Sequence, residues 1–194
     1  MTRIALLLAL LLLAACAPKP PAPATPRQIT ALALALRQMS PDVDPTEATI
    51  AARLSYATSR ELARAYHITD SPLIHNAKVN AGTRPRGLCY HWAEDMQARL
   101  EAEGFHTLDV TRAIANSDAL FLIEHSTAVL TPKGAKMEDG VVIDPWRKGG
   151  TLFWSPVTED RRYDWLPRAQ VLRDKGRIHY VHRTKGSLAA PPAE

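Results

Sequence analysis

The chain has 194 residues, 46% of them hydrophobic and 23% charged, and a formal net charge of +4. This length and composition are typical of one globular domain and exclude a wholly disordered chain or a fibrous repeat. The positive excess lies in residues 145–194, which carry ten basic and five acidic side chains. We interpret it as a basic surface and expect no nucleic-acid partner, because the overall charge is too small for a dedicated nucleic-acid-binding protein.

The N-terminus predicts export. Arg3 precedes an unbroken apolar run over residues 4–15, which suits a secretory signal and is shorter than the roughly 20 residues that span a bilayer. The run ends in Leu-Ala-Ala-Cys at residues 13–16, which resembles the bacterial lipobox. The resemblance implies that Cys16 is acylated, becomes the mature N-terminus and anchors the protein to a membrane. A plain secretory signal is the alternative.

Residue 17 is alanine rather than the aspartate that typically retains bacterial lipoproteins in the inner membrane. The resemblance therefore implies a lipid-anchored protein of the cell envelope, on the periplasmic face of the outer membrane in a Gram-negative host. Residues 16–26 are rich in proline and alanine, which favours a semi-rigid tether of about 3.1 Å per residue. We expect one folded domain over residues 27–185 and a disordered tail over residues 186–194.

The first part of the domain is predicted to be helical. Leucine and alanine spacing favours a helix over residues 27–39. Asp44, Pro45 and Glu47 combine an N-cap, a proline at the first helical position and a capping glutamate. The helix that they start is expected to reach about residue 66, either continuously or with a break near Ser59.

Residues 67–87 show no sustained period and contain proline and glycine at several positions, which predicts a long loop. Helical spacing returns over residues 88–103, where Trp92, Met96 and Leu100 form one stripe and Gly104 ends the helix. Cys89 is thereby placed in the first turn of this helix.

The second half of the domain is predicted to consist of strands. Apolar or alternating runs cover residues 107–110, 119–123 continuing through 127–130, 141–143, 151–154 and 178–181. Residues 132–134 (Pro-Lys-Gly) favour a turn between two of them. Helices followed by strands predict an α+β fold in which N-terminal helices and a cysteine-bearing helix pack on an antiparallel sheet.

Cys89 is the one cysteine besides Cys16, so lipidation of Cys16 leaves it no partner for a disulfide within the chain. A spare thiol in an oxidising compartment is either buried as a small hydrophobic residue or functional. The functional interpretation is favoured by its position at a helix start, where the positive end of the helix dipole stabilises a thiolate.

A thiolate nucleophile needs a base, and the base needs an orienting group. His125 lies in the predicted strand segment that ends at residue 130, and Asp144 follows the run over residues 141–143. If residues 132–139 form the turn, these two strands are antiparallel neighbours, which brings His125 near Asp144.

Three short motifs thus follow in the order cysteine, histidine, aspartate. They occupy residues 87–93 (Gly-Leu-Cys-Tyr-His-Trp-Ala), 125–129 (His-Ser-Thr-Ala-Val) and 142–146 (Val-Ile-Asp-Pro-Trp). Together they resemble the transglutaminase-like branch of the papain-fold cysteine enzymes, in which a Gly-x-Cys-x-x-aromatic-Ala helix precedes a strand histidine and a strand aspartate. The resemblance covers roughly residues 80–155. It implies Cys89 as the nucleophile, His125 as base and acid, and Asp144 as the residue that orients His125.

Other parts of such a site have weaker candidates. The backbone N–H of Cys89 is a potential oxyanion donor, and a side-chain donor is sought in the preceding loop, from Asn76, Asn80 or His75. Tryptophans are the candidates for a substrate groove, with Trp92 and Trp146 on or beside the motifs.

These observations favour a lipid-anchored envelope enzyme that attacks amide bonds and forms an acyl-enzyme, either as a peptidase or amidase or as an acyltransferase. Its expected substrates are envelope proteins or peptidoglycan stem peptides, and we expect a monomer without a cofactor or metal. One alternative is a non-catalytic peptide-binding or scaffold module on the same fold. Another is a metal-binding lipoprotein that uses Cys89, His91 and His125.

Overall fold

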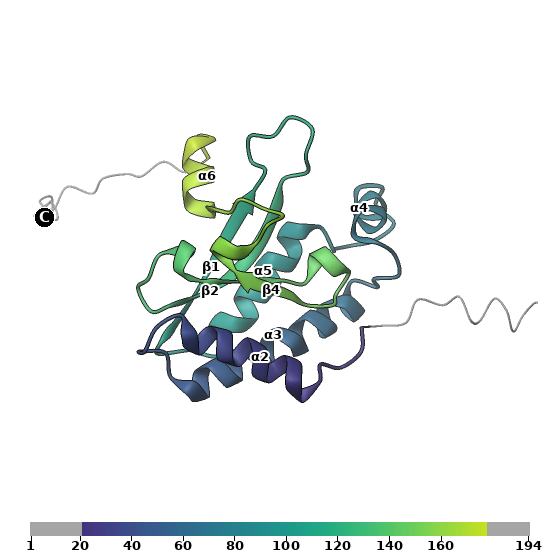
Figure 1. The fold of residues 1–194 in the computed structure, drawn as a ribbon. Coiled ribbons are helices and arrows are strands. Elements are labelled where there is room, and N and C mark those ends of the chain that lie inside the picture. The colour runs from purple at the N-terminus through teal and green to yellow at the C-terminus, as the bar shows by residue number, and fades with distance from the viewer. Residues whose placement is uncertain (1–20, 178–194) are drawn as a thin grey trace, which may run out of the picture.

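The computed structural model describes residues 21–177. Four predicted features lie outside the described residues: the signal segment, the acylation of Cys16, a strand over residues 178–181 and a disordered tail over residues 186–194. Within them the chain forms five α-helices and one five-stranded antiparallel sheet (Figure 1). The predicted α+β class is therefore confirmed.

The helices are α2 (Pro26–Gln38), α3 (Pro45–Ala65), α4 (Pro72–Asn80), α5 (Cys89–Glu101) and α6 (Arg168–Asp174). The strands are β1 (Leu108–Ala115), β2 (His125–Pro132), β3 (Val141–Asp144), β4 (Phe153–Pro156) and β5 (Leu166–Pro167). Three 3-10 turns, η1 (Met137–Asp139), η2 (Trp146–Lys148) and η3 (Val157–Glu159), link the later strands.

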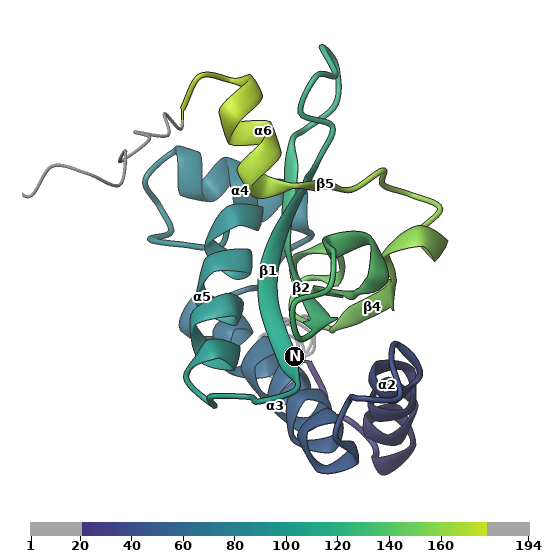
Figure 2. The same cartoon turned by 90° about the vertical axis from the view of Figure 1, so that its left-hand side faces the viewer.

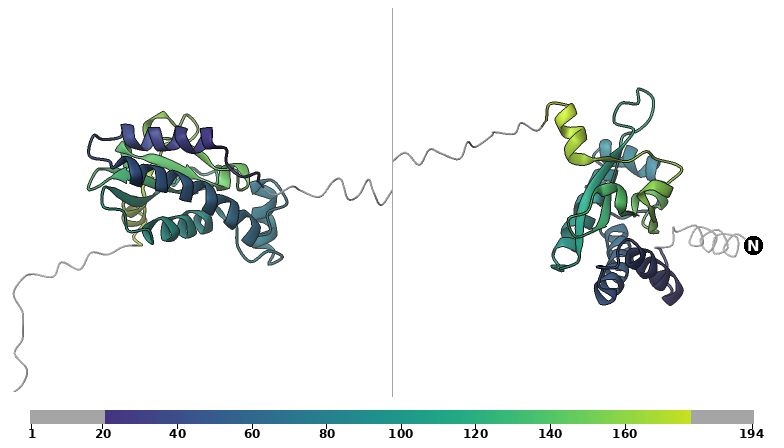
Figure 3. Two further views of the ribbon diagram at one scale, coloured as in Figure 1. Left: turned by 90° about the horizontal axis from the view of Figure 1, so that it is seen from below. Right: turned by 60° about the vertical axis from the view of Figure 1, so that its left-hand side comes forward.

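The two N-terminal helices lie side by side (Figure 3) and start where the sequence predicts. The carboxylate of Asp44 accepts hydrogen bonds from the backbone N–H groups of Thr46 and Glu47 at 2.7 and 2.9 Å, which satisfies donors at the start of α3. Helix α3 continues without a break through Ser59, whose hydroxyl donates to the carbonyl of Gly150 at 2.8 Å. None of the helices in residues 21–177 is long and apolar enough to cross a membrane.

Contacts with the folded domain already occur before residue 27, where the sequence predicts that the domain begins. Nε of Arg60 in α3 donates to the carbonyl of Pro21 at 3.2 Å. The part of the predicted tether that lies within the described residues is therefore held against α3 at this point.

Three segments differ from the predictions. The expected loop over residues 67–87 contains α4, a short helix with Pro72 at its start that buries one side chain, His75. The expected strand over residues 119–123 is a loop between β1 and β2, whose apolar side chains face solvent. The strand β5 and helix α6 follow β4 without a periodic signal in the sequence. Short elements escape detection because few residues carry their pattern.

The sheet has the strand order β4-β3-β2-β1-β5, so β2 and β3 are antiparallel neighbours, as predicted. Val129 of β2 pairs with Val142 of β3. Both residues belong to a core with Val157 and Trp165, on one face of the sheet. Alternate residues of the same strands face the opposite way, into the core that α2, α3 and α5 share with the sheet (Figure 2).

Candidate active site

Helix α5 begins at Cys89 after a tight turn at Gly87. Gly87 has a φ of +126°, and a Cβ atom at this position would lie 2.4 Å from Nε2 of the buried His75. Nε2 of His75 is also 2.9 Å from the carbonyl oxygen of Arg86. The glycine of the first motif is therefore required by its backbone conformation and by close contact with His75 of α4.

Trp92 does not line a groove. Its side chain is 1% exposed, and its indole N–H donates to the carbonyl of Gly87 at 3.0 Å. Its ring also packs edge-on against Tyr66 of α3, with 4.8 Å between the ring centroids. The expectation of a substrate-lining Trp92 is therefore wrong, because this side chain fixes the turn that places Cys89.

His91 interacts with the start of its own helix. Its Nδ1 accepts hydrogen bonds from the backbone N–H groups of Gly87 and Leu88 at 3.2 and 3.3 Å. Burial, followed by the charge of Arg86, lowers the pKa of His91, which favours the neutral imidazole that this acceptor role requires. Within residues 21–177, no group of three or more histidine, cysteine, aspartate or glutamate side chains is arranged to hold a metal ion.

His125 and Asp144 form a buried pair. Nε2 of His125, the first residue of β2, lies 2.7 Å from Oδ2 of Asp144, the last residue of β3, and both side chains are 1% exposed. The strand pairing predicted from the sequence is what brings them together. Such a bond orients the imidazole and leaves its Nδ1 for another partner.

The pair has a definite charge state. Burial alone lowers the pKa of His125, but the Asp144 carboxylate and the Cys89 thiol outweigh it and raise this pKa to about 9. Burial raises the pKa of Asp144, whereas the charges of His125 and Arg147 hold it below its ordinary value. Both shifts favour an imidazolium beside a carboxylate.

Cys89 is a neighbour of the His125 imidazole. Nδ1 of His125 is buried and has no hydrogen-bond partner among the described residues. The thiol of Cys89 is nevertheless close enough to raise the pKa of His125. The thiol itself is 8% exposed and donates to the carbonyl of Glu124 at 3.5 Å. The three residues expected to form a catalytic triad thus lie near one another.

Arg112 of β1 is a neighbour of Cys89 that the sequence did not indicate. Burial lowers the pKa of its guanidinium, as does the charge of Arg168, whereas the proximity of Cys89 raises it. Its Nη2 donates to the carbonyl of Tyr90 and to the hydroxyl of Ser126, each at 3.3 Å. Arg112 thus places a fixed positive charge near Cys89.

A second arginine, Arg147, binds the carboxylate of Asp144. The backbone N–H of Arg147 donates to Oδ1 of Asp144 at 3.1 Å, and its Nε donates to Oδ2 at 2.9 Å. The two Nη atoms of Arg147 bind both oxygens of Asp160 at 3.0 and 2.6 Å. Asp160 in turn accepts from the indole N–H of Trp165 at 2.9 Å. Asp144 is therefore held by a buried hydrogen-bond network that extends through Arg147 and Asp160 to Trp165.

Three aromatic rings surround the imidazole. The ring centroids of Trp146, Tyr163 and Trp165 lie 4.6, 4.7 and 5.3 Å from that of His125. Tyr163 and Trp165 come from the segment before β5, for which the sequence offers no signal, since they are remote from the three motifs. Together the rings exclude water from His125, which is 1% exposed.

A pocket of about 520 Å³ lies beside this aromatic wall. We call it the side pocket; it is lined by Ser71, Pro72, Leu73, Asn116, Phe121, Leu122, Ile123, Trp146, Arg147, Arg162 and Tyr163. Trp146 thus lines a pocket, as expected, and its indole N–H donates to Oδ1 of Asn76 at 3.1 Å. Asn76 lies beside the site through this bond, whereas Asn80 is exposed at the end of α4.

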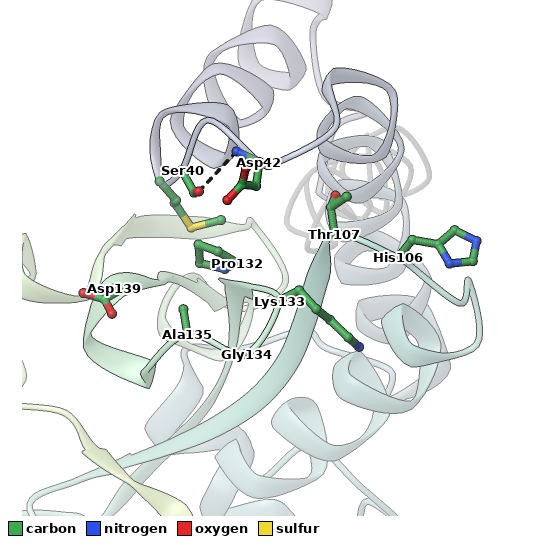
Figure 4. A pocket seen from close by; sticks show the side chains of 10 residues that line it. Ser40, Asp42, His106, Thr107, Pro132, Lys133, Gly134, Ala135 and Asp139 are labelled. Carbon is green, nitrogen blue, oxygen red and sulfur yellow. Dashed lines mark hydrogen bonds between the residues drawn. The ribbon is translucent and has the colours of Figure 1, made fainter.

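Another cavity, of about 640 Å³, lies at the opposite end of β2 from His125. Its walls include Pro132, Lys133 and Asp139, and Figure 4 shows the ring of His106 turned away from it. Nζ of Lys133 is 2.6 Å from Oδ1 of Asp109. This cavity brings together none of the predicted site residues.

Comparison of the chain with protein-family models, with curated proteins and with solved structures finds no match.

Proposed function

We propose that this protein is a cysteine enzyme of the transglutaminase-like type that acts on amide bonds through an acyl-enzyme. The observation that carries the proposal is the sequence of contacts from Cys89, at the start of α5, through His125 to Asp144. A buried imidazole that is bonded to a carboxylate and has a thiol as a neighbour is the arrangement that activates a thiol nucleophile.

The proposed reaction uses these residues in turn. In the resting enzyme His125 already holds the proton of Cys89, the sulfur attacks the amide carbonyl as a thiolate, and the imidazolium gives its proton to the departing amine. Water or a second amine then attacks the thioester, with His125 accepting and returning a proton again. Hydrolysis gives a peptidase or amidase, and attack by an amine gives an acyltransferase.

The developing oxyanion needs hydrogen-bond donors. We propose the backbone N–H of Cys89, because it belongs to the first turn of α5 and has no acceptor within its own helix. The side-chain donor we propose is Nδ2 of Asn76, because its Oδ1 is already engaged by Trp146. On the lipobox resemblance, we propose that the enzyme is anchored to the cell envelope through Cys16 and acts there on proteins or peptidoglycan peptides.

The test is the rate of Cys89 alkylation by iodoacetamide as a function of pH. A Cys16→Ser chain has Cys89 as its only thiol. The alkylation rate of an unperturbed thiol rises with a midpoint at about pH 8.5, whereas a thiolate paired with histidine stays reactive well below neutral pH. We expect such a low-pH plateau and its loss in the additional His125→Ala or Asp144→Ala variants.

A single rise near the unperturbed value, or no reaction in the native protein, would contradict the enzyme proposal. It would favour a non-catalytic module that binds peptides through the side pocket.

A further inference from the structure

An apolar surface next to the candidate triad lacks a partner among the described residues. The loop between β1 and β2 exposes Leu120, Phe121, Leu122 and Ile123, with exposed fractions between 54 and 97%. Leu73 and Ile74 of α4 are exposed by 56 and 54%. Phe121, Leu122, Ile123 and Leu73 line the side pocket, so the loop and α4 form two of its walls. Contiguous exposed apolar side chains typically mark a binding site.

The inner wall of the side pocket is shared with the triad. Trp146 and Tyr163 line the pocket and at the same time contact the His125 ring. Trp146 also belongs to one apolar cluster with Cys89. A group bound in the pocket therefore contacts the same two rings that pack against His125, a position that suits the side chain of the acyl part of a substrate.

The charges of the lining narrow the class of ligand. The two ionised residues among them are Arg147 and Arg162, and no carboxylate lines the pocket. Arg147 is engaged by Asp144 and Asp160, while the guanidinium of Arg162 lies over the Tyr163 ring, 5.6 Å from its centroid. A cationic side chain entering this pocket meets the charge of Arg162 and finds no carboxylate in the lining to pair with.

We propose that the side pocket binds a large apolar, uncharged side chain of a peptide substrate, adjacent to the carbonyl that Cys89 attacks. This inference rests on the proposed function and names its substrate class: acyl groups with a bulky aliphatic or aromatic side chain, in preference to small or cationic ones. Burial of Leu73, Phe121 and Leu122 against such a side chain provides the selectivity.

The experiment uses the full chain carrying Cys16→Ser and three N-acetyl-aminoacyl fluoromethyl ketones with leucine, alanine or lysine side chains. In each reaction the sulfur of Cys89 forms a bond to the methylene carbon and fluoride leaves. We expect the leucine reagent to inactivate about tenfold faster than the alanine reagent, as burying a few methyl groups allows, and the lysine reagent to be slowest.

The chain offers matched control positions. Leu122 lines the pocket, whereas Leu120, two positions earlier in the same loop, is 91% exposed and lies outside it. Leu73 and Ile74 form a similar pair on α4. We expect Leu122→Ser and Leu73→Ser each to slow the leucine reagent about fivefold. Leu120→Ser and Ile74→Ser should leave it unchanged, and iodoacetamide should react equally with all four.

Two different failures can be told apart. If iodoacetamide shows the low-pH plateau but the leucine and alanine reagents react equally, the pocket assignment is overturned and the proposed function stands. The pocket assignment is also overturned if Leu120→Ser slows the leucine reagent as much as Leu122→Ser. Equal effects would mean that the effect does not depend on whether the side chain lines the pocket. If Cys89 reacts only as an unperturbed thiol, the proposed function fails and this inference fails with it.

Discussion

Arg147 donates to both carboxylate oxygens of Asp144, through its backbone N–H at 3.1 Å and through Nε at 2.9 Å. Oδ2, the oxygen that Nε binds, is also the one 2.7 Å from His125. A carboxylate that accepts several such bonds stays ionised although it is fully buried. Arg147 therefore orients the carboxylate that faces His125 and, together with His125, keeps it ionised.

We predict that Asp144→Asn lowers the pKa of His125 from about 9 to below its ordinary value. Burial lowers this pKa, and the variant removes the charge that opposes burial most strongly. The titration of the His125 ring, followed by NMR, measures the change. Asp109→Asn is the control, since Asp109 pairs with Lys133 at the surface. An unshifted His125 in Asp144→Asn would show that the carboxylate does not set its charge.

The second prediction concerns stability against pH. His125 has a folded-state pKa of about 9, above its ordinary value of 6.5, so its contribution to stability is fully present below about pH 6.5. This contribution is lost as the pH rises towards 9. Urea unfolding should show that the wild-type free energy of unfolding decreases over this interval more steeply than that of His125→Gln. Parallel pH profiles of the two proteins would contradict the prediction.

The third prediction is that Arg147→Gln destabilises the fold by about 3–5 kcal/mol, because it leaves the buried Asp160 without its cation and removes one of the two cations that face Asp144. Arg147→Lys keeps the charge but loses the planar fork that binds Asp160 through two bonds, so it should rescue the loss only in part. Lys148→Gln, at the exposed neighbouring position, should change stability by less than about 0.5 kcal/mol. Chemical denaturation compares the three variants, and equal losses for Arg147→Gln and Lys148→Gln would refute the network.

The fourth prediction compares two glycines with positive φ. Gly134, with a φ of +72°, has open space where a Cβ would be, whereas a Cβ on Gly87 would meet the His75 ring at 2.4 Å. Gly134→Ala should therefore cost only the backbone strain, about 1–2 kcal/mol, and Gly87→Ala should cost clearly more. Thermal unfolding measures both losses. Gly87→Ala should also change the alkylation rate of Cys89, which Gly134→Ala should not do.

Much of this protein follows from local sequence signals. The N-cap of α3, the stripe of α5 and the position of Cys89 in the first turn of α5 could be predicted, because capping and helical period depend on neighbouring residues. The pairing of β2 with β3 also followed, since the turn between them is short. That pairing is what joined His125 to Asp144.

The environment of the site was decided by the tertiary structure. Tyr163 and Trp165 reach His125 from a segment with no periodic signal, and Asp160 meets Arg147 through side chains alone. Trp92 belongs to the motif over residues 87–93 that resembles a catalytic helix start, yet its place in the core depends on how α5 packs against Tyr66 of α3. Contacts between segments far apart in the chain depend on register, loop path and packing together, and a local pattern contains none of these.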